Sequence, residues 1–425
     1  MAEAPRLAIS AVTAVRLLRR DPLGLLERAA REGDVVRIRV PRLDLFVVNR
    51  PELVWDVLAT HGGRFTKGPT MQAAKRMLGE SLLTSEGEQH RSQRRLIQPL
   101  FHHERIAALV PSIRAAGERA STRWTDAERI EVRAEMARLT LSIVVETLFG
   151  AGIDDRDAVR IGEALNDVLA QFDRVFSPFL PLTEHLPIPS TLRFRRARAV
   201  FDRTIYRMIA ERRARGVGGD DLLSLLMRAQ EAGASMTDEQ VRDEAITIFL
   251  AGHETTANAL AWTWLLLSGN PEADRRFGER VDDRTFVQAV LHESLRLYPP
   301  AWAIGRRVIA EHEADGIAIP AGSVVIVSPW LLHHDPRWWR DPAVFDPGRW
   351  LDGEPATDRH AYLPFGGGSR MCIGEGFAEL EASTLLATIG RNWRFEHDPA
   401  DVVRLQPVVT LRPESGLWMR ARRRP

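Results

Sequence analysis

The cysteine Cys372 lies in the segment whose residue types are best suited to chemistry, and it is the only cysteine of the chain. The segment reads Pro-Phe-Gly-Gly-Gly-Ser-Arg-Met-Cys-Ile-Gly and ends at Gly374. Its glycines permit positive φ and a close approach of the backbone to a flat group. The helix predicted to follow supplies free N–H groups and partial positive charge, which stabilise a thiolate. With Arg370 available to pair with an anion, the pattern indicates a thiolate ligand to haem iron rather than a buried structural cysteine beside a turn.

A polar pair, Glu254 and Thr255, falls inside a predicted helix, residues 238–267, that is apolar on most sides. A helix of this kind is buried in the centre of a large domain. The hydroxyl of a mid-helix threonine can bond back to a carbonyl and bend the helix, and a bulge there can hold water. With an acid beside it, such a threonine builds a proton path into an apolar pocket. The alternative is a threonine packed by its methyl group beside a glutamate that reaches the helix edge.

Two further pairs of charged residues have helical spacing. Glu293 and Arg296 stand at i and i+3, and His90 and Arg94 stand at i and i+4, so each pair shares one helix face. Surface pairs of this kind are common and contribute little to stability. The residues alone therefore leave a solvated surface pair as the alternative in both places.

Taken together, these segments resemble the cytochrome P-450 family, the haem-thiolate monooxygenases, in its soluble bacterial type. The family's pattern Phe-x-x-Gly-x-Arg-x-Cys-x-Gly is complete in Phe365, Gly368, Arg370, Cys372 and Gly374. Three further motifs occur in the family's order: Ala251-Gly252-His253-Glu254-Thr255-Thr256, Glu293-Ser294-Leu295-Arg296 and Phe345-Asp346-Pro347-Gly348-Arg349-Trp350. The resemblance covers nearly the whole chain, with one departure at Gly348, where the family usually has glutamate. It implies a mainly α fold with a small β region around a buried haem.

The resemblance also implies a role for individual residues. Cys372 is expected to be the metal ligand of haem b, with Glu254 and Thr255 delivering protons to dioxygen. A buried structural triad is expected between Glu293, Arg296 and Arg349. The residues expected at the cofactor are His90, Arg94, Ala251, Arg306, Phe365, Gly368, Arg370, Cys372 and Gly374. Among them, His90, Arg94 and Arg306 resemble contacts to the haem propionates, with Arg307 as the alternative to Arg306.

The expected substrate pocket is mostly apolar. By resemblance its lining includes Met77, Phe172, Phe176, Ile248, Ala251, Trp302, Ile304 and Val408. Burial of apolar ligand surface is favourable, whereas an unpaired buried charge is very costly, so we expect a neutral apolar small molecule such as a terpene, steroid or alkyl-aromatic compound. Three basic residues in or beside the predicted loops, Lys75, Arg76 and Arg174, could instead bind a carboxylate, which keeps fatty acids as the second choice.

The elements that must position these residues are mostly helices. Helical periodicity predicts a largely helical part over residues 88–298, which includes helices over 104–124, 158–176 and 281–298 and a loop over 177–189, and a final helix over 374–391. Strands are predicted near 35–50, 316–328 and 402–420, the first as a hairpin over 35–48. Within the first hundred residues, 22–32 and 51–60 read as helices, whereas 66–83 reads as a loop because it has weak periodicity and two glycines. Because no linker divides the chain, a single large domain is expected over residues 1–425.

Composition excludes several other classes of protein. The chain carries 58 basic and 57 acidic residues, a net charge of +1, so it has no overall attraction to nucleic acid. One cysteine cannot form an intrachain disulfide, a four-cysteine zinc site or an iron–sulfur cluster, and it fits a reducing cytoplasm. The longest N-terminal apolar stretch, residues 7–18, is too short to span a bilayer. We therefore expect a cytoplasmic protein without an integral membrane segment.

The resemblance implies a monooxygenase that inserts one oxygen atom of O2 into its substrate. About fifty residues follow the cysteine, which leaves no room for flavin or ferredoxin domains. Electrons are therefore expected from a separate ferredoxin or flavodoxin-type donor with its reductase, and NAD(P)H takes part only indirectly. The alternatives are a peroxide-driven or isomerising enzyme on the same fold, against which the intact Glu254-Thr255 pair argues, and a non-catalytic haem sensor, which needs no proton relay.

Overall fold

The computed structural model describes residues 2–150, 164, 188–216, 218–219, 221–231, 236–351, 353 and 355–425. The described chain forms two compact units, each assembled from separate stretches of sequence. The first unit contains Met1–Pro69, Gly269–Cys372 and Arg404–Glu414, and the second contains Thr70–Ser268, Ile373–Val403 and Ser415–Pro425. The single domain expected from the sequence stays a prediction.

A five-stranded sheet forms the centre of the first unit. In spatial order its strands are β1 (Val35–Val40), β2 (Leu43–Val48), β8 (Val324–Val327), β5 (Ile304–Val308) and β3 (Phe65–Lys67). Only β2 and β8 run parallel within it, and the other neighbours are antiparallel. Two hairpins accompany the sheet, β6 (His312–Ala314) with β7 (Ile317–Ile319) and β10 (Leu405–Pro407) with β11 (Leu411–Pro413).

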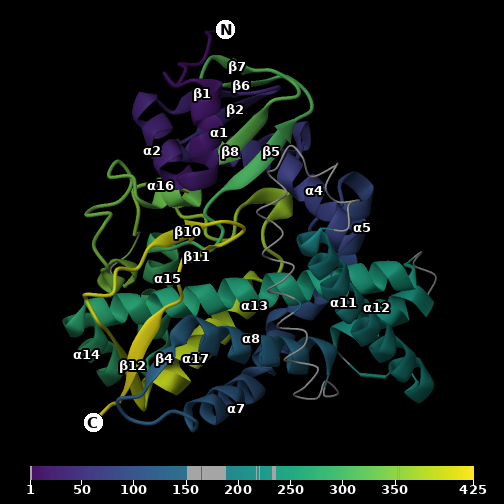
Figure 1. The fold of residues 1–425 in the computed structure, drawn as a ribbon, viewed down its shortest axis with the longest axis vertical. Helices are drawn as coiled ribbons and strands as arrows, with labels where there is room; N and C mark the ends of the chain where they lie inside the picture. Colours follow the sequence, from purple (N-terminus) through teal and green to yellow (C-terminus); the bar gives the residue numbers. More distant parts are fainter. Residues whose placement is uncertain are drawn as a thin grey trace. The chain divides into compact units, whose positions relative to one another are not determined.

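Two of the helices in the first unit pack against its sheet through their apolar faces. The helices of the first unit are α1 (Ala11–Arg20), α2 (Pro22–Glu32), α3 (Pro51–Trp55), α14 (Pro271–Glu279), α15 (Arg284–Leu297) and α16 (Pro329–His333). α1 and α2 pack against β1 (Figure 1). Leu25 of α2 and Ile38 of β1 belong to one buried apolar cluster, which fixes the helix pair on the sheet.

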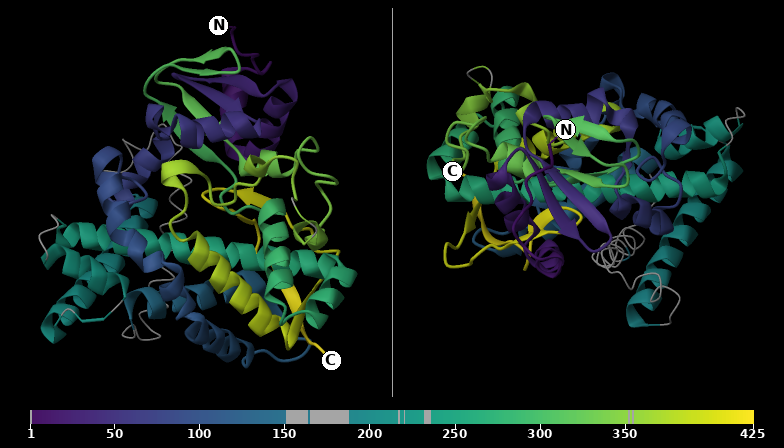
Figure 2. Two further views of the ribbon diagram at one scale, coloured as in Figure 1. Left: turned by 180° about the vertical axis from the view of Figure 1, so that it is seen from behind. Right: turned by 90° about the horizontal axis from the view of Figure 1, so that it is seen from above.

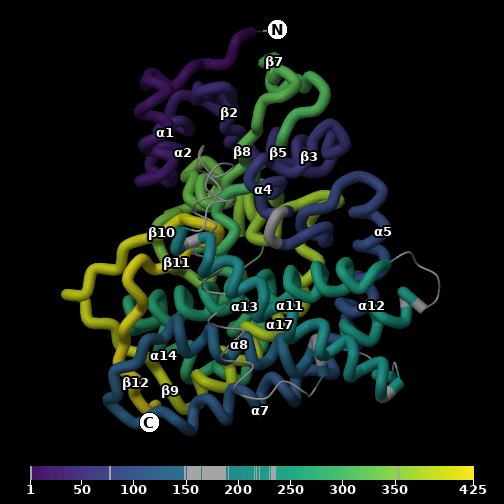
Figure 3. Tube along the Cα trace, turned by 45° about the vertical axis from the view of Figure 1, so that its right-hand side comes forward, coloured from purple at the N-terminus to yellow at the C-terminus, as the bar shows by residue number. Residues whose placement is uncertain are grey.

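The second unit is mainly helical. Its helices are α4 (Pro69–Leu78), α5 (Gly87–Ile97), α6 (His103–Ala107), α7 (Val110–Ser121), α8 (Val132–Phe149), α11 (Pro189–Arg215), α12 (Leu222–Glu231), α13 (Asp238–Gly269) and α17 (Glu375–Gly390). α17 packs along α7 (Figure 2), where the side chains of Leu385 and Thr388 lie against Gly117. A three-stranded antiparallel sheet completes the unit. β12 (Trp418–Arg423) lies between β4 (Arg129–Glu131) and β9 (Trp393–His397), and Figure 3 shows β9 and β12 side by side.

Most of the predicted elements are present with shifted ends. The hairpin predicted at 35–48 is β1 and β2, and the buried helix predicted over 238–267 is α13. The helix predicted over 281–298 begins only at Arg284, because the Asp283 side chain accepts hydrogen bonds from the first-turn N–H groups. The single helix predicted over 104–124 is divided into α6 and α7. The helix predicted over 158–176 and the loop predicted over 177–189 lie outside the described residues, except for the single position 164, which is helical, and positions 188 and 189.

The loop predicted over residues 66–83 is wrong, because α4 occupies most of it. The two glycines that suggested a loop flank the helix instead of interrupting it. Gly68 precedes Pro69, and Gly79 follows Leu78 with a φ of +62°, the left-handed conformation that ends many helices. Within α4, Ala74 and Leu78 are buried one turn apart, which is enough to hold a short helix in place.

No helix in the described part of the chain is both long and apolar enough to cross a membrane. Residues 11–18 of the N-terminal apolar stretch belong to α1, whose N-cap is Ser10.

Candidate active site

The loop that carries Cys372 is held in shape by backbone contacts within the first unit. The Cys372 N–H donates to the carbonyl oxygen of Phe365 at 3.0 Å, while the residue itself is exposed. Gly368 has a φ of +69°, and a Cβ atom there would lie 2.1 Å from the carbonyl oxygen of Leu58. Only glycine fits this position. The loop therefore lies flat against the chain at Leu58 and leaves the thiol accessible.

Arg370 uses its guanidinium to fix the same loop. It donates to the carbonyl oxygens of Gly62 at 3.3 Å and Phe65 at 3.0 Å. The side chain is partly buried. Arg370 thus connects the cysteine loop to the start of β3, and its expected role at a propionate stays a prediction. Gly374, the last residue of the motif, belongs to the second unit, where it is the N-cap of α17.

Two buried cations lie opposite each other on neighbouring strands of the first unit. Arg306 on β5 is the register partner of Lys67 on β3, and their exposed fractions are 7% and 5%. Arg307, the next residue, points the other way and is exposed. Like charges directly opposite each other destabilise a sheet, so an anion near both cations would be favourable. Strand alternation therefore favours Arg306 over Arg307 as the anion-binding residue, and it adds Lys67, which the sequence analysis missed.

These features fit the flat, anionic haem that the sequence predicts. The accessible thiol, the glycine that places the loop flat and the pair of buried cations all occur within the first unit. The sequence signal for Lys67 was a basic residue next to Gly68, but both lie in the segment 66–83, which the sequence predicts to be a loop.

The polar pair in α13 belongs to the second unit. Most positions of this helix are buried, and Glu254 and Ile248 are among them. Ala251 is exposed and Thr255 partly exposed, so one face of the helix is open in its middle. The Thr255 hydroxyl donates to the carbonyl oxygen of Ala251 at 2.7 Å, which is the back-bond expected of a mid-helix threonine.

Buried titratable groups surround this stretch of α13 and were not singled out from the sequence. Glu381 on α17 is fully buried, and burial raises the pKa of its carboxyl group well above the ordinary value, while the Thr256 hydroxyl offsets this only in part. Burial, with a smaller effect of Arg133, lowers the pKa of His253 to about 4. Burial therefore favours the neutral form of both side chains. An acidic residue at a helix position with apolar neighbours was the only sequence signal for Glu381.

His90 and Arg94 lie one turn apart on α5, as their spacing indicated. His90 is buried and Arg94 is partly buried, so the pair is not a solvated surface pair. By contrast, Arg91 on the same helix is exposed and forms an ion pair with Glu88 at 2.6 Å. The expected propionate contacts of His90 and Arg94 stay predictions.

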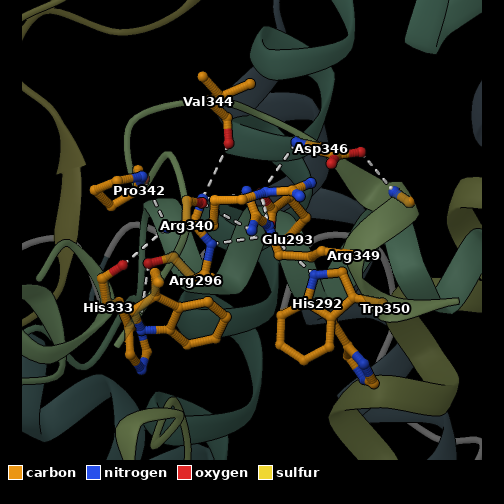
Figure 4. Close-up of polar contacts among 12 residues, drawn as sticks. His292, Glu293, Arg296, His333, Arg340, Pro342, Val344, Asp346, Arg349 and Trp350 are labelled. Atoms are coloured by element: carbon orange, nitrogen blue, oxygen red, sulfur yellow. Dashed lines mark hydrogen bonds and ion pairs between the residues drawn. The ribbon is translucent and has the colours of Figure 1, made fainter. Parts of the chain in front are cut away.

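The Glu293 carboxylate lies at the centre of a dense polar cluster in the first unit (Figure 4). Glu293 and Arg296 are fully buried. The carboxylate accepts hydrogen bonds from Arg296 at 2.8 and 2.9 Å and from Arg349 at 3.0 Å, which brings together the three residues grouped from the sequence. Trp350 Nε1 at 2.9 Å and the Asp346 N–H at 3.0 Å complete its partners.

This cluster joins α15 to the irregular stretch that follows α16. Arg296 also donates to the carbonyl oxygens of His333, Pro342 and Val344. Burial alone raises the pKa of Glu293, but the hydrogen bonds and charge of Arg296 outweigh it, so the pKa lies below the ordinary value. Gly348, the departure from the family pattern, donates its N–H to Asp346 at 2.9 Å, and a Cβ there would lie 2.9 Å from that carboxylate oxygen.

Only some of the residues expected to line the substrate pocket belong to the described part of the chain. Trp302 donates its indole N–H to the carbonyl oxygen of Val408 at 3.0 Å, which connects two of the expected segments within the first unit. Ile304 is partly buried on β5. Phe172 and Phe176, with Arg174, lie outside the described residues, as do the side chains of Arg76 and Met77. Lys75 forms an ion pair with Glu80, which satisfies its charge.

Comparison with known proteins adds an independent finding. The family model described as "Cytochrome P450" matches residues 13–418. The chain is 37% identical to cyclooctatin synthase of Streptomyces melanosporofaciens, with 93% of this chain and 90% of that protein covered. It is 36% identical to cyclooctat-9-en-7-ol 5-monooxygenase of the same organism (89% and 86% covered), and 32% identical to pentalenene oxygenase of Streptomyces avermitilis (92% and 91% covered).

The fold of this chain is similar to that of a solved structure from Thermus. The crystal structure of CYP175A1 matches with a TM-score of 0.81 at 29% identity, covering 99% of this chain and all (100%) of that one. The fold is thus mainly α with a small β region, as the sequence predicted.

Proposed function

This chain belongs to the cytochrome P450 family and is a monooxygenase, and from that premise we propose that its substrate is a neutral ring compound of terpene type. The observation that carries the proposal is the 36% identity, over 398 residues, to a protein named as a monooxygenase of cyclooctat-9-en-7-ol. The similarity to a pentalenene oxygenase extends over 410 residues and agrees with it. Neither compound name denotes an acid or a base.

In this proposal Cys372 holds the haem iron through its thiolate. Arg306 and Lys67 pair with haem carboxylates, and His90 and Arg94 provide further contacts. When bound, a thiolate-ligated haem supplies the reductive activation of dioxygen and the insertion of one oxygen atom into the substrate. The accessible Cys372 thiol and the register of Lys67 with Arg306 support this assignment.

The proposed role of Glu254 and Thr255 is the delivery of protons to dioxygen. The Thr255 hydroxyl donates a hydrogen bond to the Ala251 carbonyl oxygen, which leaves the hydroxyl oxygen able to accept a hydrogen bond. Glu254 supplies exchangeable protons from the neighbouring position. Both residues lie in the middle of α13, next to Ala251, where one face of the helix is open.

An apolar substrate agrees with the residues that are described. Ile248 and Ala251 offer aliphatic surface on α13, and burial of apolar ligand surface contributes about 25 cal/mol per Å2. A carboxylate would need a cation inside the protein. Of the three basic residues considered for that purpose, Lys75 is already ion-paired with Glu80. The electrons come from a separate ferredoxin or flavodoxin-type protein with its reductase, and the reaction takes place in the cytoplasm.

The experiment compares a neutral cyclic terpene with its carboxylic-acid analogue. The holoenzyme is titrated with each compound, the spectral change of the haem reports binding, and turnover is measured with a ferredoxin and its reductase. The neutral compound should bind more tightly and be hydroxylated or epoxidised. If the acid binds more tightly, and Lys75→Ala, Arg76→Ala or Arg174→Ala abolishes that advantage, the substrate is a fatty acid or a similar carboxylate instead.

A further inference from the structure

A second group of potential metal ligands lies in the first unit and has no part in the function proposed above. Asp56, His61 and His312 each offer one ligand atom, and these atoms all lie within 4.8 Å of one another. The Asp56 carboxylate lies between the two imidazoles. Its Oδ1 is 2.6 Å from Nδ1 of His61, and its Oδ2 is 2.9 Å from Nε2 of His312.

An unusual turn brings Asp56 and His61 together. His61 stands five positions after Asp56, so on an α-helix their side chains would point roughly 140° apart. The segment Asp56–Thr60 is instead a π-helix, and the His61 N–H donates to the carbonyl oxygen of Asp56 at 2.8 Å. The wider turn places both side chains on one side of the helix. Single π-turns occur often at functional sites.

His312 provides the observation that points to a ligand. Its side chain, on β6, is only 2% exposed. Within the described part of the chain, neither of its ring nitrogens has a hydrogen-bond partner, and the close approach of Asp56 to Nε2 does not have hydrogen-bond geometry. A buried imidazole is costly when its Nδ1 lacks a partner and its Nε2 meets only a poorly aligned carboxylate, and a bound ion is one of the recognised explanations.

We propose that Asp56, His61 and His312 bind one Zn2+ ion, with a water molecule as the fourth ligand. Two imidazoles and one carboxylate form the donor set of zinc sites that keep an open position. Ligand atoms of one tetrahedral zinc ion lie about 3.3 Å apart, so small side-chain rotations of Asp56 and His61 are sufficient. His61 is 48% exposed, which gives the ion a route of entry and the water a place.

The ligand types favour zinc over harder cations. Mg2+ and Ca2+ prefer sites made of several oxygen ligands, whereas this cluster offers two imidazole nitrogens and one carboxylate. Imidazole nitrogen bonds strongly to Zn2+ and poorly to those ions. The ion connects the π-helix to β6 and stabilises this part of the first unit.

The test uses the untagged holoenzyme, stripped with EDTA and titrated with ZnCl2 by calorimetry, and needs neither substrate nor turnover. We expect one strong Zn2+ site per chain, a higher melting temperature with Zn2+, and no such effect of MgCl2. His61→Ala should weaken Zn2+ binding by at least about tenfold and remove the thermal effect. This variant is decisive because His61 is exposed, so its loss does not disturb the core as His312→Gln could.

The matched control is the double variant His102→Ala/His103→Ala, which removes two exposed histidines outside the cluster. It should keep the strong site. The proposal is overturned if the wild type shows no stoichiometric Zn2+ binding, because the three residues then form a bridge between side chains only. It is also overturned if His61→Ala binds Zn2+ as tightly as the wild type, or if the control variant abolishes binding.

Discussion

At the scale of single residues, the proposed chemistry depends on two positions with unusual local structure. In the middle of α13, the Thr255 hydroxyl donates a hydrogen bond to a carbonyl oxygen of its own helix. Gly368 occupies a conformation and a space that no other residue fits. In the proposed reaction, Thr255 contributes its hydroxyl oxygen, and Gly368 shapes the loop that carries the Cys372 thiol.

Thr255→Ala should uncouple the reaction. We expect the variant to consume reductant at a similar rate but to release most of the electrons as hydrogen peroxide, because protons no longer reach dioxygen in the productive order. The measurement is product and peroxide formed per NAD(P)H consumed.

The matched control for this substitution is Thr263→Ala in the same helix. Thr263 is buried and makes the same back-bond, to Ala259 at 2.7 Å, so its loss reproduces the change in helix geometry. Thr263→Ala should remain coupled, and Thr255→Ser should recover most of the coupling. Equal product per electron in Thr255→Ala and the wild type would remove Thr255 from the mechanism.

At the scale of elements, polar clusters inside the two units connect segments that hydrophobic packing alone would not align. The cluster at Glu293 attaches the irregular stretch that follows α16 to α15 (Figure 4). The buried carboxyl of Glu381 lies on α17, close to Thr256 of α13. The pKa of Glu293 is lowered in the folded state, whereas that of Glu381 is raised, so the contributions of the two carboxyl groups to stability depend on pH in opposite directions.

Glu293→Gln should destabilise the protein by about 3–5 kcal/mol, because it leaves the buried guanidinium of Arg296 without its counter-charge. The pKa of Glu293 is lowered in the folded state, so its stabilising effect is present above the ordinary pKa and is lost as the pH falls through the folded value. The free energy of unfolding of the wild type and the variant should therefore converge at low pH. Urea unfolding across the acid range measures this. A loss no larger than that of Arg340→Ala, an exposed neighbour, would contradict the structural role.

Glu381→Gln should have the opposite pH dependence. Because the pKa of Glu381 is raised in the folded state, its contribution is fully present below the ordinary pKa and is lost as the pH rises through the folded value. The glutamine keeps the shape of the neutral acid, so the variant should become more stable relative to the wild type as the pH rises above about 4.5. Thermal unfolding of both proteins from pH 5 to 9 tests this, with Glu379→Gln, partly exposed on the same helix, as the control. A difference in stability that does not change with pH would show that Glu381 is ionised in the folded protein.

At the scale of the whole molecule, the sequence predicted those parts that depend on local pattern. The cysteine loop, the buried helix around Glu254 and the grouping of Glu293 with Arg296 and Arg349 follow from spacing and from the family resemblance. Pairing between distant strands was not predictable. β3 has only three residues, so nothing local indicates that Lys67 faces Arg306.

Two other features could not be settled from the local sequence, for similar physical reasons. Arg306 was predicted with Arg307 as the alternative, because the strand itself does not show which face of the sheet is covered. The π-turn that brings Asp56 next to His61 replaces an α-turn without a distinctive residue, so periodicity reads the segment as ordinary helix. In both cases tertiary packing decides the outcome among conformations that the local sequence allows.

The central claim is that Cys372 is the thiolate ligand of the haem, and one spectrum tests it. The ferrous holoenzyme is exposed to carbon monoxide, and the difference spectrum is recorded for the wild type and for Cys372→Ser. The wild type should show the strongly red-shifted Soret band of thiolate-ligated haem, and Cys372→Ser should lose it. The same band in Cys372→Ser, or the band of a histidine-ligated haem in the wild type, would contradict the assignment.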